Sequence, residues 1–176
     1  HKDLKRSREF LKEIGLTLAK VQSALKDFPY KSVPPNYLHP EYQQKYNFSK
    51  EETPTSEAIK NVIDRLYILF EDLKLPKTLI HGDLNDGNYL TQGNKITAVL
   101  DLETSEHNFR ILDISAAIYY THPSSGLSYS EVSKLIIEGF ESLLKLSEEE
   151  IQTIPKAVQY NAACFSLWSL ANEKGQ

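Results

Sequence analysis

Two short apolar runs that each end in an acidic residue constrain this chain more than any other feature of its sequence. The first run, Leu79-Ile80, leads into His81-Gly82-Asp83, and the second, Ala98-Val99-Leu100, ends at Asp101. A short apolar run bounded by glycine and polar residues is typical of a strand that stops at a turn. The pattern therefore predicts two short strands that hold carboxylates at their tips.

The spacing of the polar residues around these tips narrows the chemistry. Asn88 lies five positions after Asp83, and Asp101 lies eighteen positions after it. A kinase catalytic loop uses an aspartate that takes the proton of the substrate hydroxyl, an asparagine on one Mg²⁺ and a second aspartate between Mg²⁺ and the phosphates. Mg²⁺ prefers oxygen ligands and needs only one or two carboxylates beside phosphates and water. We therefore expect Asp83 to be the catalytic base, and Asn88 and Asp101 to be magnesium ligands.

The complete motif resembles the aminoglycoside phosphotransferase and choline kinase superfamily, including its homoserine-kinase-like members. It reads His81-Gly-Asp83-x-x-x-x-Asn88 followed by Val99-Leu-Asp101-Leu-Glu103. The resemblance implies a small-molecule kinase that uses ATP and Mg²⁺ to phosphorylate a hydroxyl group. It also implies an α+β, mainly α fold: a protein-kinase-like C-terminal lobe in which short β-hairpins carry the catalytic loop.

The same resemblance suggests roles for residues around the motif. It implies that Leu90 and Leu100 form an apolar floor beneath the adenine, and that Asp113 supports the catalytic loop from the start of a small-residue helix. The alternative for Asp113 is an ordinary acidic residue that is favourable near a helix N-terminus. In the family, an N-terminal helix carries a pattern near Leu-Ala-x-Leu-His, whereas this chain has Gln22 in place of the histidine.

Three motif residues have simpler readings beside the functional ones. His81 either holds backbone through hydrogen bonds or acts as a base, and we favour the first. Asp86 is either a further ligand or part of the turn Asn85-Asp86-Gly87, and we favour the turn. Glu103 either assists Mg²⁺, meets a cationic substrate or is an ordinary glutamate at the end of a strand.

Helices are predicted wherever apolar residues recur at three- and four-residue steps or a capping signal stands before them. Three predicted helices run from Ser7 to Phe28, from the Thr53-Pro54 cap to Pro76, and over Ile111–Ile118. Two more begin at the capping boxes Ser128-x-x-Glu131 and Ser147-x-x-Glu150. The last begins at Pro155 and carries an aromatic stripe with Phe165 and Trp168, which we expect in the core. A strand is expected over Lys95–Leu100. The segment from Phe28 to Pro54 lacks such periodicity and is rich in proline, so it is either a solvated connection or an insertion that binds the acceptor with Tyr37, His39 and Tyr42.

Bulk properties exclude several classes of protein. The chain has 176 residues with 40% hydrophobic composition, which suits one domain over residues 1–176. The net charge of −4 and the lack of a basic cluster beyond the first few residues offer no nucleic-acid footprint. The single cysteine, Cys164, excludes an internal disulfide, and no apolar run is long enough to span a membrane. We expect a cytoplasmic protein with no membrane or nucleic-acid partner.

The chain contains no Met, even at position 1, and no Gly-rich phosphate loop or strand lysine. In a kinase the Gly-rich phosphate loop and the strand lysine belong to an N-terminal lobe. We therefore expect the chain to be a C-terminal lobe whose partner is the missing N-terminal lobe of the same protein. Alone, such a fragment is expected to be inactive and prone to self-association through the surface that its partner lobe covers.

Two further function classes remain open beside the kinase. One is a non-catalytic kinase-like scaffold or binding protein, which has no physical need for the Asp83, Asn88 and Asp101 set. The other is a metal-dependent hydrolase that uses His81 and Asp83, for which the sequence offers no further clustered histidine. The acceptor is not selected by the motif, and aminoglycosides, choline or ethanolamine, homoserine and sugars all remain open.

Overall fold

Helices dominate the fold, and the strands are short. The structure is a computed structural model, and it describes residues 7–29 and 53–172; Tyr37, His39 and Tyr42 lie outside these residues. The helices are α1 (Arg8–Leu25), α3 (Pro54–Asp72), α4 (Ile111–Ser125), α5 (Tyr129–Glu141) and α6 (Glu148–Asn172). The strands are β1 (Lys77–Ile80), β2 (Tyr89–Gln92), β3 (Lys95–Val99) and β4 (Glu106–Phe109), and η2 (Leu102–Thr104) is a 3₁₀ turn.

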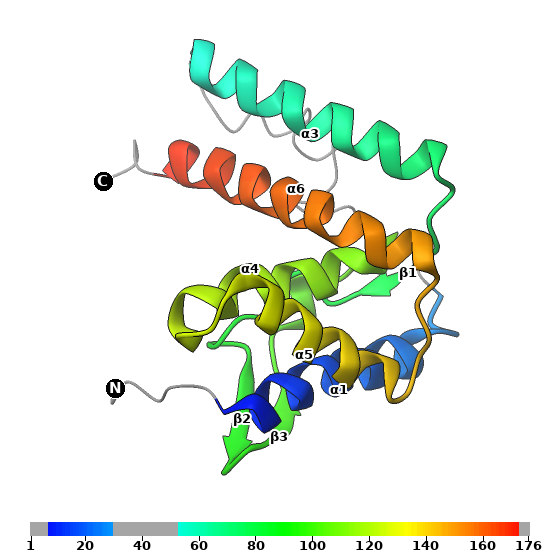
Figure 1. Ribbon diagram of the computed structural model, residues 1–176. Coiled ribbons are helices and arrows are strands. Elements are labelled where there is room, and N and C mark those ends of the chain that lie inside the picture. Colours follow the sequence, from blue (N-terminus) through cyan, green and yellow to red (C-terminus); the bar gives the residue numbers. More distant parts are fainter. Residues whose placement is uncertain (1–6, 30–52, 173–176) are drawn as a thin grey trace.

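The helices pack around α4. Every residue from Ile111 to Ile118 is buried, as expected for a helix segment that is apolar on nearly all sides. Helix α6 covers one side of α4 and α3 lies against α6, whereas α5 and α1 pack together on the other side (Figure 1). Within the described ranges, none of the helices is both long and apolar enough to cross a membrane.

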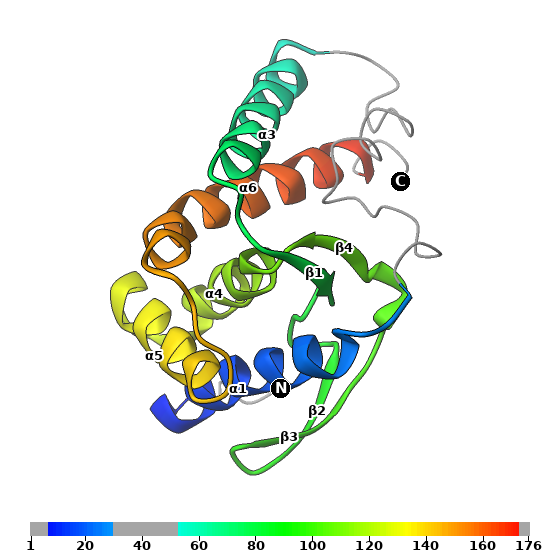
Figure 2. The ribbon, with the colours of Figure 1, turned by 90° about the vertical axis from the view of Figure 1, so that its right-hand side faces the viewer.

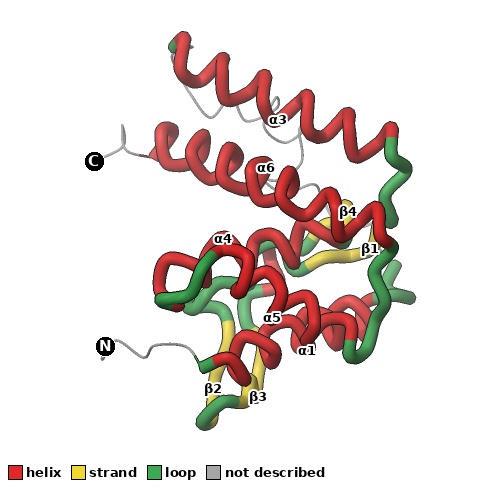
Figure 3. The backbone as a smooth tube through the Cα atoms, in the orientation of Figure 1, coloured by secondary structure: helices red, strands yellow, loops and turns green. Residues whose placement is uncertain are grey.

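Two separate sheets hold the strands. Strand β1 pairs antiparallel with β4, with Lys77 opposite Phe109 and Ile80 opposite Glu106. Strand β2 pairs antiparallel with β3 and has an irregularity after Leu90. The β2–β3 hairpin lies beside α1, away from β1 and β4 (Figure 2). The segment His81–Asn88 therefore connects two sheets. Figure 3 shows that strands make up only a small part of the fold.

Strand β4 escaped prediction because its buried side is polar. Glu106 and Asn108 are buried, and Asn108 Nδ2 donates a hydrogen bond to Glu106 Oε1 at 2.8 Å. Strands are recognised in a sequence by alternating apolar and polar residues, and this strand has polar residues on its inner face. Only its pairing with β1 identifies it as a strand.

The predicted caps are confirmed at three helices. Thr53 caps α3 with Pro54 in the first turn, and Ser128 and Glu131 form the capping box of α5. Before α6, the Ser147 amide donates to Glu150 Oε2 at 2.8 Å and the Glu150 amide donates to Ser147 Oγ at 3.2 Å. These short-range pairs depend on neighbouring residues alone, which is why the sequence predicts them well.

The prediction that Pro155 begins the last helix is wrong. Pro155 lies inside α6, which starts at Glu148. A proline in a helix interior removes one backbone hydrogen bond and costs about 3 kcal/mol. Ile154 and Ala157 on either side are buried in the core, so their packing outweighs the loss and the helix continues through the proline.

Some apolar residues of the helices are exposed, among them Trp168, which we expected in the core. Trp168 is 42% exposed and stacks on Phe165 at 5.8 Å between ring centroids. Val62 on α3 and Phe28, which follows the end of α1, are also exposed. The described neighbours of α3 lie on its α6 side, so a side chain on the opposite side stays in solvent whatever its periodicity.

A buried ion pair joins the starts of α4 and α6, and we expect its loss to destabilise the fold. Arg110 donates to both carboxylate oxygens of Glu150, which is almost fully buried. Removing one partner of such a pair leaves the other charge unpaired, so Glu150→Gln should lower the free energy of unfolding by about 3 kcal/mol near neutral pH. Urea unfolding measures this, with Glu149→Gln on the exposed side of α6 as the control.

The effect of Glu150→Gln should depend on pH. Burial raises the pKa of Glu150, but hydrogen bonds from Arg110 and Ser147 outweigh it and the net pKa is lowered. The stabilisation by the carboxylate is therefore complete above the pKa of an unfolded glutamate and is lost as the pH falls through the lower pKa of the folded state. An equal difference between the two proteins at neutral pH and in strong acid would contradict this assignment.

Candidate active site

His81 ties the tips of the two apolar runs together. Its side chain is fully buried, Nε2 lies 2.9 Å from the Leu100 carbonyl oxygen, and Nδ1 accepts the Asp83 amide at 3.2 Å. These contacts fit the tautomer that carries its proton on Nε2. Both ring nitrogens are engaged by backbone groups, which leaves neither for a metal ion and argues against the hydrolase that would use His81.

Asp113 holds the backbone at the start of the loop. Its Oδ2 accepts the His81 amide at 3.1 Å and its Oδ1 accepts the Gly82 amide at 2.9 Å. Gly82 has a φ of 84°, in the left-handed region that favours glycine. Gln22 Nε2 donates to Asp113 Oδ2 at 3.1 Å and to the Arg110 carbonyl oxygen at 3.0 Å. Burial raises the pKa of Asp113, and the hydrogen bonds from Gly82 and Gln22 oppose that shift.

Asp83 and Asn88 contact each other directly. Asn88 Nδ2 donates to the Asp83 carbonyl oxygen at 2.7 Å and to Asp83 Oδ2 at 3.1 Å. Asn85 Nδ2 donates to the same carboxylate oxygen at 3.0 Å. The Asp83 carboxylate is partly buried and is fixed by two side-chain amides. The loop thus joins Asp83, the predicted base, and Asn88, a predicted magnesium ligand, into one hydrogen-bonded unit.

The β2–β3 hairpin returns the chain to the same region. Asn88 directly precedes β2, and its carbonyl oxygen accepts the Leu100 amide at 2.9 Å. Asp101 follows Leu100, whose own carbonyl oxygen meets His81. Asp101 is exposed and has φ 60° and ψ 61°, a left-handed conformation that costs a non-glycine residue about 1 kcal/mol. The chain reverses here into η2, and Thr104 Oγ1 donates to the His81 carbonyl oxygen at 3.1 Å.

The remaining predicted residues surround this unit on the surface. Leu90 is 54% exposed and Leu100 is 39% exposed, and both belong to the hairpin or its end. Glu103 is exposed on η2. Asp86 is exposed within the turn, and its Oδ1 accepts the Tyr89 hydroxyl at 2.8 Å. Among residues 7–29 and 53–172, no group of three or more His, Cys, Asp or Glu side chains is arranged to hold a metal ion.

Two residues of α1 that contact this region were not predicted as functional. Glu13 and Gln22 are 5% and 3% exposed, although both are polar. Gln22 stands four residues after Leu18, so it lies on the apolar face of the helix. The signal in the sequence was a polar residue at a position where the helical periodicity places buried residues, because a buried polar group needs a hydrogen-bond partner. The sequence does not identify that partner.

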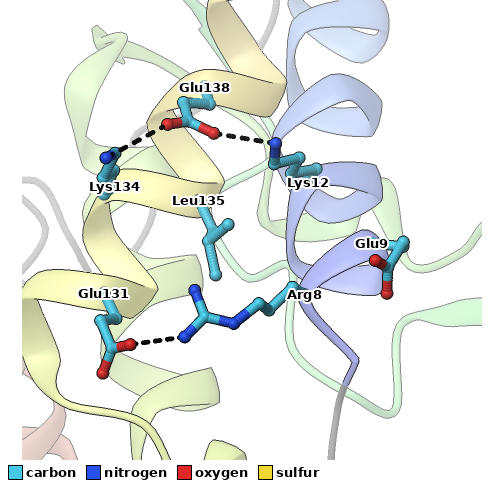
Figure 4. Close-up of a pocket in the computed structure, with 7 residues that line it drawn as sticks. All are labelled: Arg8, Glu9, Lys12, Glu131, Lys134, Leu135 and Glu138. Carbon is cyan, nitrogen blue, oxygen red and sulfur yellow. Dashed lines mark hydrogen bonds and ion pairs between the residues drawn. The ribbon is translucent and has the colours of Figure 1, made fainter.

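A surface pocket lies elsewhere, between α1 and α5. Its volume is about 510 Å³, and its lining is charged apart from Leu135 (Figure 4). Arg8 pairs with Glu131 at 2.6 Å, and Lys12 pairs with Glu138 at 2.9 Å. None of the motif residues lines it. The pocket is therefore separate from the loop His81–Asn88.

Comparisons with known sequences support the family resemblance of the motif. The profile of a family described as "Phosphotransferase enzyme family" matches residues 1–134. A homoserine kinase of Rhizobium meliloti (strain 1021) is 26% identical over 165 residues, which cover 90% of this chain and 50% of the relative. A homoserine kinase of Sinorhizobium fredii is 27% identical over 97 residues, 54% of this chain and 30% of that relative. The chain thus spans half or less of the length of these relatives.

Solved structures confirm the expected fold. Amicoumacin kinase hAmiN, in complex with AMP-PNP, Ca²⁺ and Ami, superposes with a TM-score of 0.73 at 15% identity, over 93% of this chain and 52% of that protein. The choline kinase LicA from Streptococcus pneumoniae gives a TM-score of 0.68 at 18% identity, over 96% and 57%. At such identities the likeness shows the fold alone, and that fold is the kinase-like, mainly helical one.

Proposed function

The chain belongs to the phosphotransferase enzyme family, and on that premise we propose that it is the catalytic and acceptor-binding lobe of an ATP-dependent kinase for a small-molecule hydroxyl group. The observation that carries the proposal is the direct contact of Asp83 with Asn88, whose side-chain amide reaches both the carbonyl and the carboxylate of Asp83. We further propose that the other half of a longer protein supplies the N-terminal nucleotide lobe, in line with the length of the relatives.

In this proposal Asp83 orients the acceptor and takes its proton. Its Oδ2 is engaged by Asn85 and Asn88, so we assign Oδ1 to the acceptor hydroxyl. Holding the carboxylate in one orientation aligns the hydroxyl oxygen with the phosphorus atom before reaction. As the new bond from the acceptor oxygen to the γ-phosphorus of ATP forms, the bond from that phosphorus to the bridging oxygen would break and ADP would leave, while the hydroxyl proton passes to the carboxylate. His81 and Asp113 act on the backbone beneath Asp83 and would keep that orientation constant.

The residues at the two ends of the hairpin fit a magnesium ion. The Nδ2 atom of Asn88 is committed to Asp83, so the opposite end of the amide, Oδ1, is the atom left for a metal. Asp101 contributes a carboxylate that is exposed to solvent. An amide oxygen and a carboxylate are hard donors of the kind that Mg²⁺ takes together with phosphate oxygens. When bound, the ion would neutralise charge on the transferring phosphoryl group.

The nucleotide base is assigned to the exposed leucines. Leu90 and Leu100 present apolar side chains on the same hairpin whose ends carry the proposed metal ligands. An adenine that covers them would remove apolar surface from water. That a solved neighbour was obtained with AMP-PNP and Ca²⁺ supports a nucleotide and a divalent ion for this chain. Glu103, two residues after Asp101, is proposed as a supporting residue at the metal or the acceptor.

The test is an acceptor screen on the full-length protein. Homoserine, choline, ethanolamine, aminoglycosides and sugars are each added with ATP and Mg²⁺, and nucleotide consumption is followed against an acceptor-free blank. We expect one class to raise consumption and a chelator to abolish it. A protein that binds no Mg²⁺-nucleotide and consumes none would instead be the non-catalytic scaffold.

Residues 1–176 alone are expected to bind Mg²⁺-ATP weakly and to transfer no phosphoryl group. In kinases the Gly-rich loop and the phosphate-pairing lysine belong to the N-terminal lobe, so one lobe makes only part of the nucleotide contacts. Isothermal titration of this chain and of the full-length protein measures the difference. Equal affinities, or turnover by the isolated chain, would contradict the division into two lobes.

A further inference from the structure

We propose that Glu13 of α1 is a positioning residue that fixes the β2–β3 hairpin and thereby sets the affinity for the metal-nucleotide complex. This role rests on the proposed function, because it acts through Asn88 and Asp101. It concerns a residue outside the catalytic motif, about 70 positions before the loop in the sequence.

Glu13 joins the helix to the strand by two interactions. Its Oε2 lies 2.9 Å from Lys95 Nζ, and its Oε1 accepts the Ile96 amide at 3.4 Å. The carboxylate is almost fully buried, whereas the Lys95 side chain is mostly exposed. A buried charge is costly unless it is paired and hydrogen-bonded. The Glu13 carboxylate on the inner side of α1 is therefore stabilised only while β3 keeps Lys95 and the Ile96 amide beside it.

The hairpin depends on such an anchor. It is a two-stranded sheet, and an isolated two-stranded hairpin is marginally stable in water. Its residues from Leu90 to Lys95 are exposed. A second contact from α1 is the ring of Phe10, whose centroid lies 6.0 Å from that of Tyr89. Helix α1 therefore holds both strands, β2 through Phe10 and β3 through Glu13.

The position of the hairpin determines where the proposed metal ligands lie. Asn88 directly precedes β2 and Asp101 stands two residues after β3, and the Leu100 amide bonds the Asn88 carbonyl oxygen across the base. A shift of β3 relative to α1 would therefore move both ends of the metal site together. Asp83, in contrast, is held through His81 and Gly82 by Asp113, which α1 contacts through Gln22, nine residues after Glu13. The acceptor side of the site thus has its own attachment to the helix through Gln22, in addition to the hydrogen bonds that join Asp83 to Asn88 and His81 to Leu100.

The experiment compares Glu13→Gln and Glu13→Ala with the control Glu9→Gln in the full-length protein. Glu9 lies on the same helix, and its side chain is exposed. Glu9→Gln therefore makes the same change of charge as Glu13→Gln, but at an exposed position. Glu13→Gln keeps an acceptor for the Ile96 amide but loses the ion pair, and Glu13→Ala loses both. We expect affinity for Mg²⁺-AMP-PNP to fall by about 10-fold in Glu13→Gln, the lower end for residues that orient metal ligands, and further in Glu13→Ala.

Two readouts separate positioning from general destabilisation. The KM for the acceptor should change less than the nucleotide affinity in Glu13→Gln, because Asp113 also holds the backbone next to Asp83. Amide hydrogen exchange should accelerate in β2 and β3 but not in α4. Unchanged nucleotide affinity in both Glu13 variants, or an equal loss of affinity for nucleotide and acceptor, overturns the role of Glu13 alone. If the unsubstituted protein binds no Mg²⁺-nucleotide, the proposed function fails and the role fails with it.

Discussion

Asp83→Asn in the full-length protein is expected to lower kcat by about 100- to 10,000-fold, the usual contribution of a general base. The substitution keeps the size of the side chain, and its amide oxygen can still accept the hydrogen bonds that Asn85 and Asn88 donate. It removes the negative charge that would orient the acceptor hydroxyl and take its proton. Affinity for Mg²⁺-nucleotide should therefore remain nearly unchanged.

Asp101→Asn provides the contrast that assigns the two aspartates. It removes a carboxylate from the proposed metal site, so nucleotide-metal affinity and turnover should both fall. Steady-state kinetics and nucleotide titration are measured on both variants, with Asp86→Asn in the exposed turn as a control that should keep parental turnover. Near-parental turnover in Asp83→Asn, or equal losses of nucleotide affinity in Asp83→Asn and Asp101→Asn, would show that these roles are wrong.

Gly139→Ala is expected to lower the free energy of unfolding by about 3 kcal/mol, the upper end of the cost of overpacking. A Cβ at Gly139 would lie 2.0 Å from the Lys12 carbonyl oxygen and 2.7 Å from its carbonyl carbon. These are backbone atoms of α1, so relief of the clash requires α1 and α5 to separate. In an open helix the same substitution would stabilise by about 1 kcal/mol, so the sign of the effect is the test.

Gly15 offers an independent check from the other helix. A Cβ at Gly15 would lie 1.9 Å from the Ile136 carbonyl oxygen, so Gly15→Ala should destabilise in the same direction. Urea unfolding of the two glycine variants is compared with Ser130→Ala, an exposed position on α5 that should change stability little. A glycine variant as stable as the parent would mean that the two helices are less closely packed than described.

The sequence predicts best what neighbouring residues decide. The caps at Thr53, Ser128 and Ser147 join residues three positions apart, and the contact of Asp83 with Asn88 joins residues five apart within one loop. Such pairs meet whenever the local backbone forms. The fold class followed from the resemblance of this local motif to a known family, whereas apolar periodicity identified the amphipathic helices before their neighbours were known.

Predictions that depended on the surroundings of an element were less secure. Pro155 is a helix breaker by its own chemistry, yet it lies within α6 because the residues on either side pack in the core. Strand β4 has polar residues on its inner face, and only its pairing with β1 makes it a strand. Trp168 belongs to an apolar stripe, and the extent of the core around α6 decides that it is exposed.

By itself the sequence determined most of the helices, their caps and the spacing of acidic and amide residues in the predicted catalytic motif. Tertiary structure alone decided how the motif is held, through Gln22 on Asp113, 91 positions away, and Glu13 on Lys95, 82 positions away. A buried polar side chain needs a hydrogen-bond partner, but many donors and acceptors in the chain could serve as that partner. The choice among them is made only when α1 packs against the loop and the hairpin, because hydrogen bonds form between atoms about 3 Å apart whatever their separation in sequence.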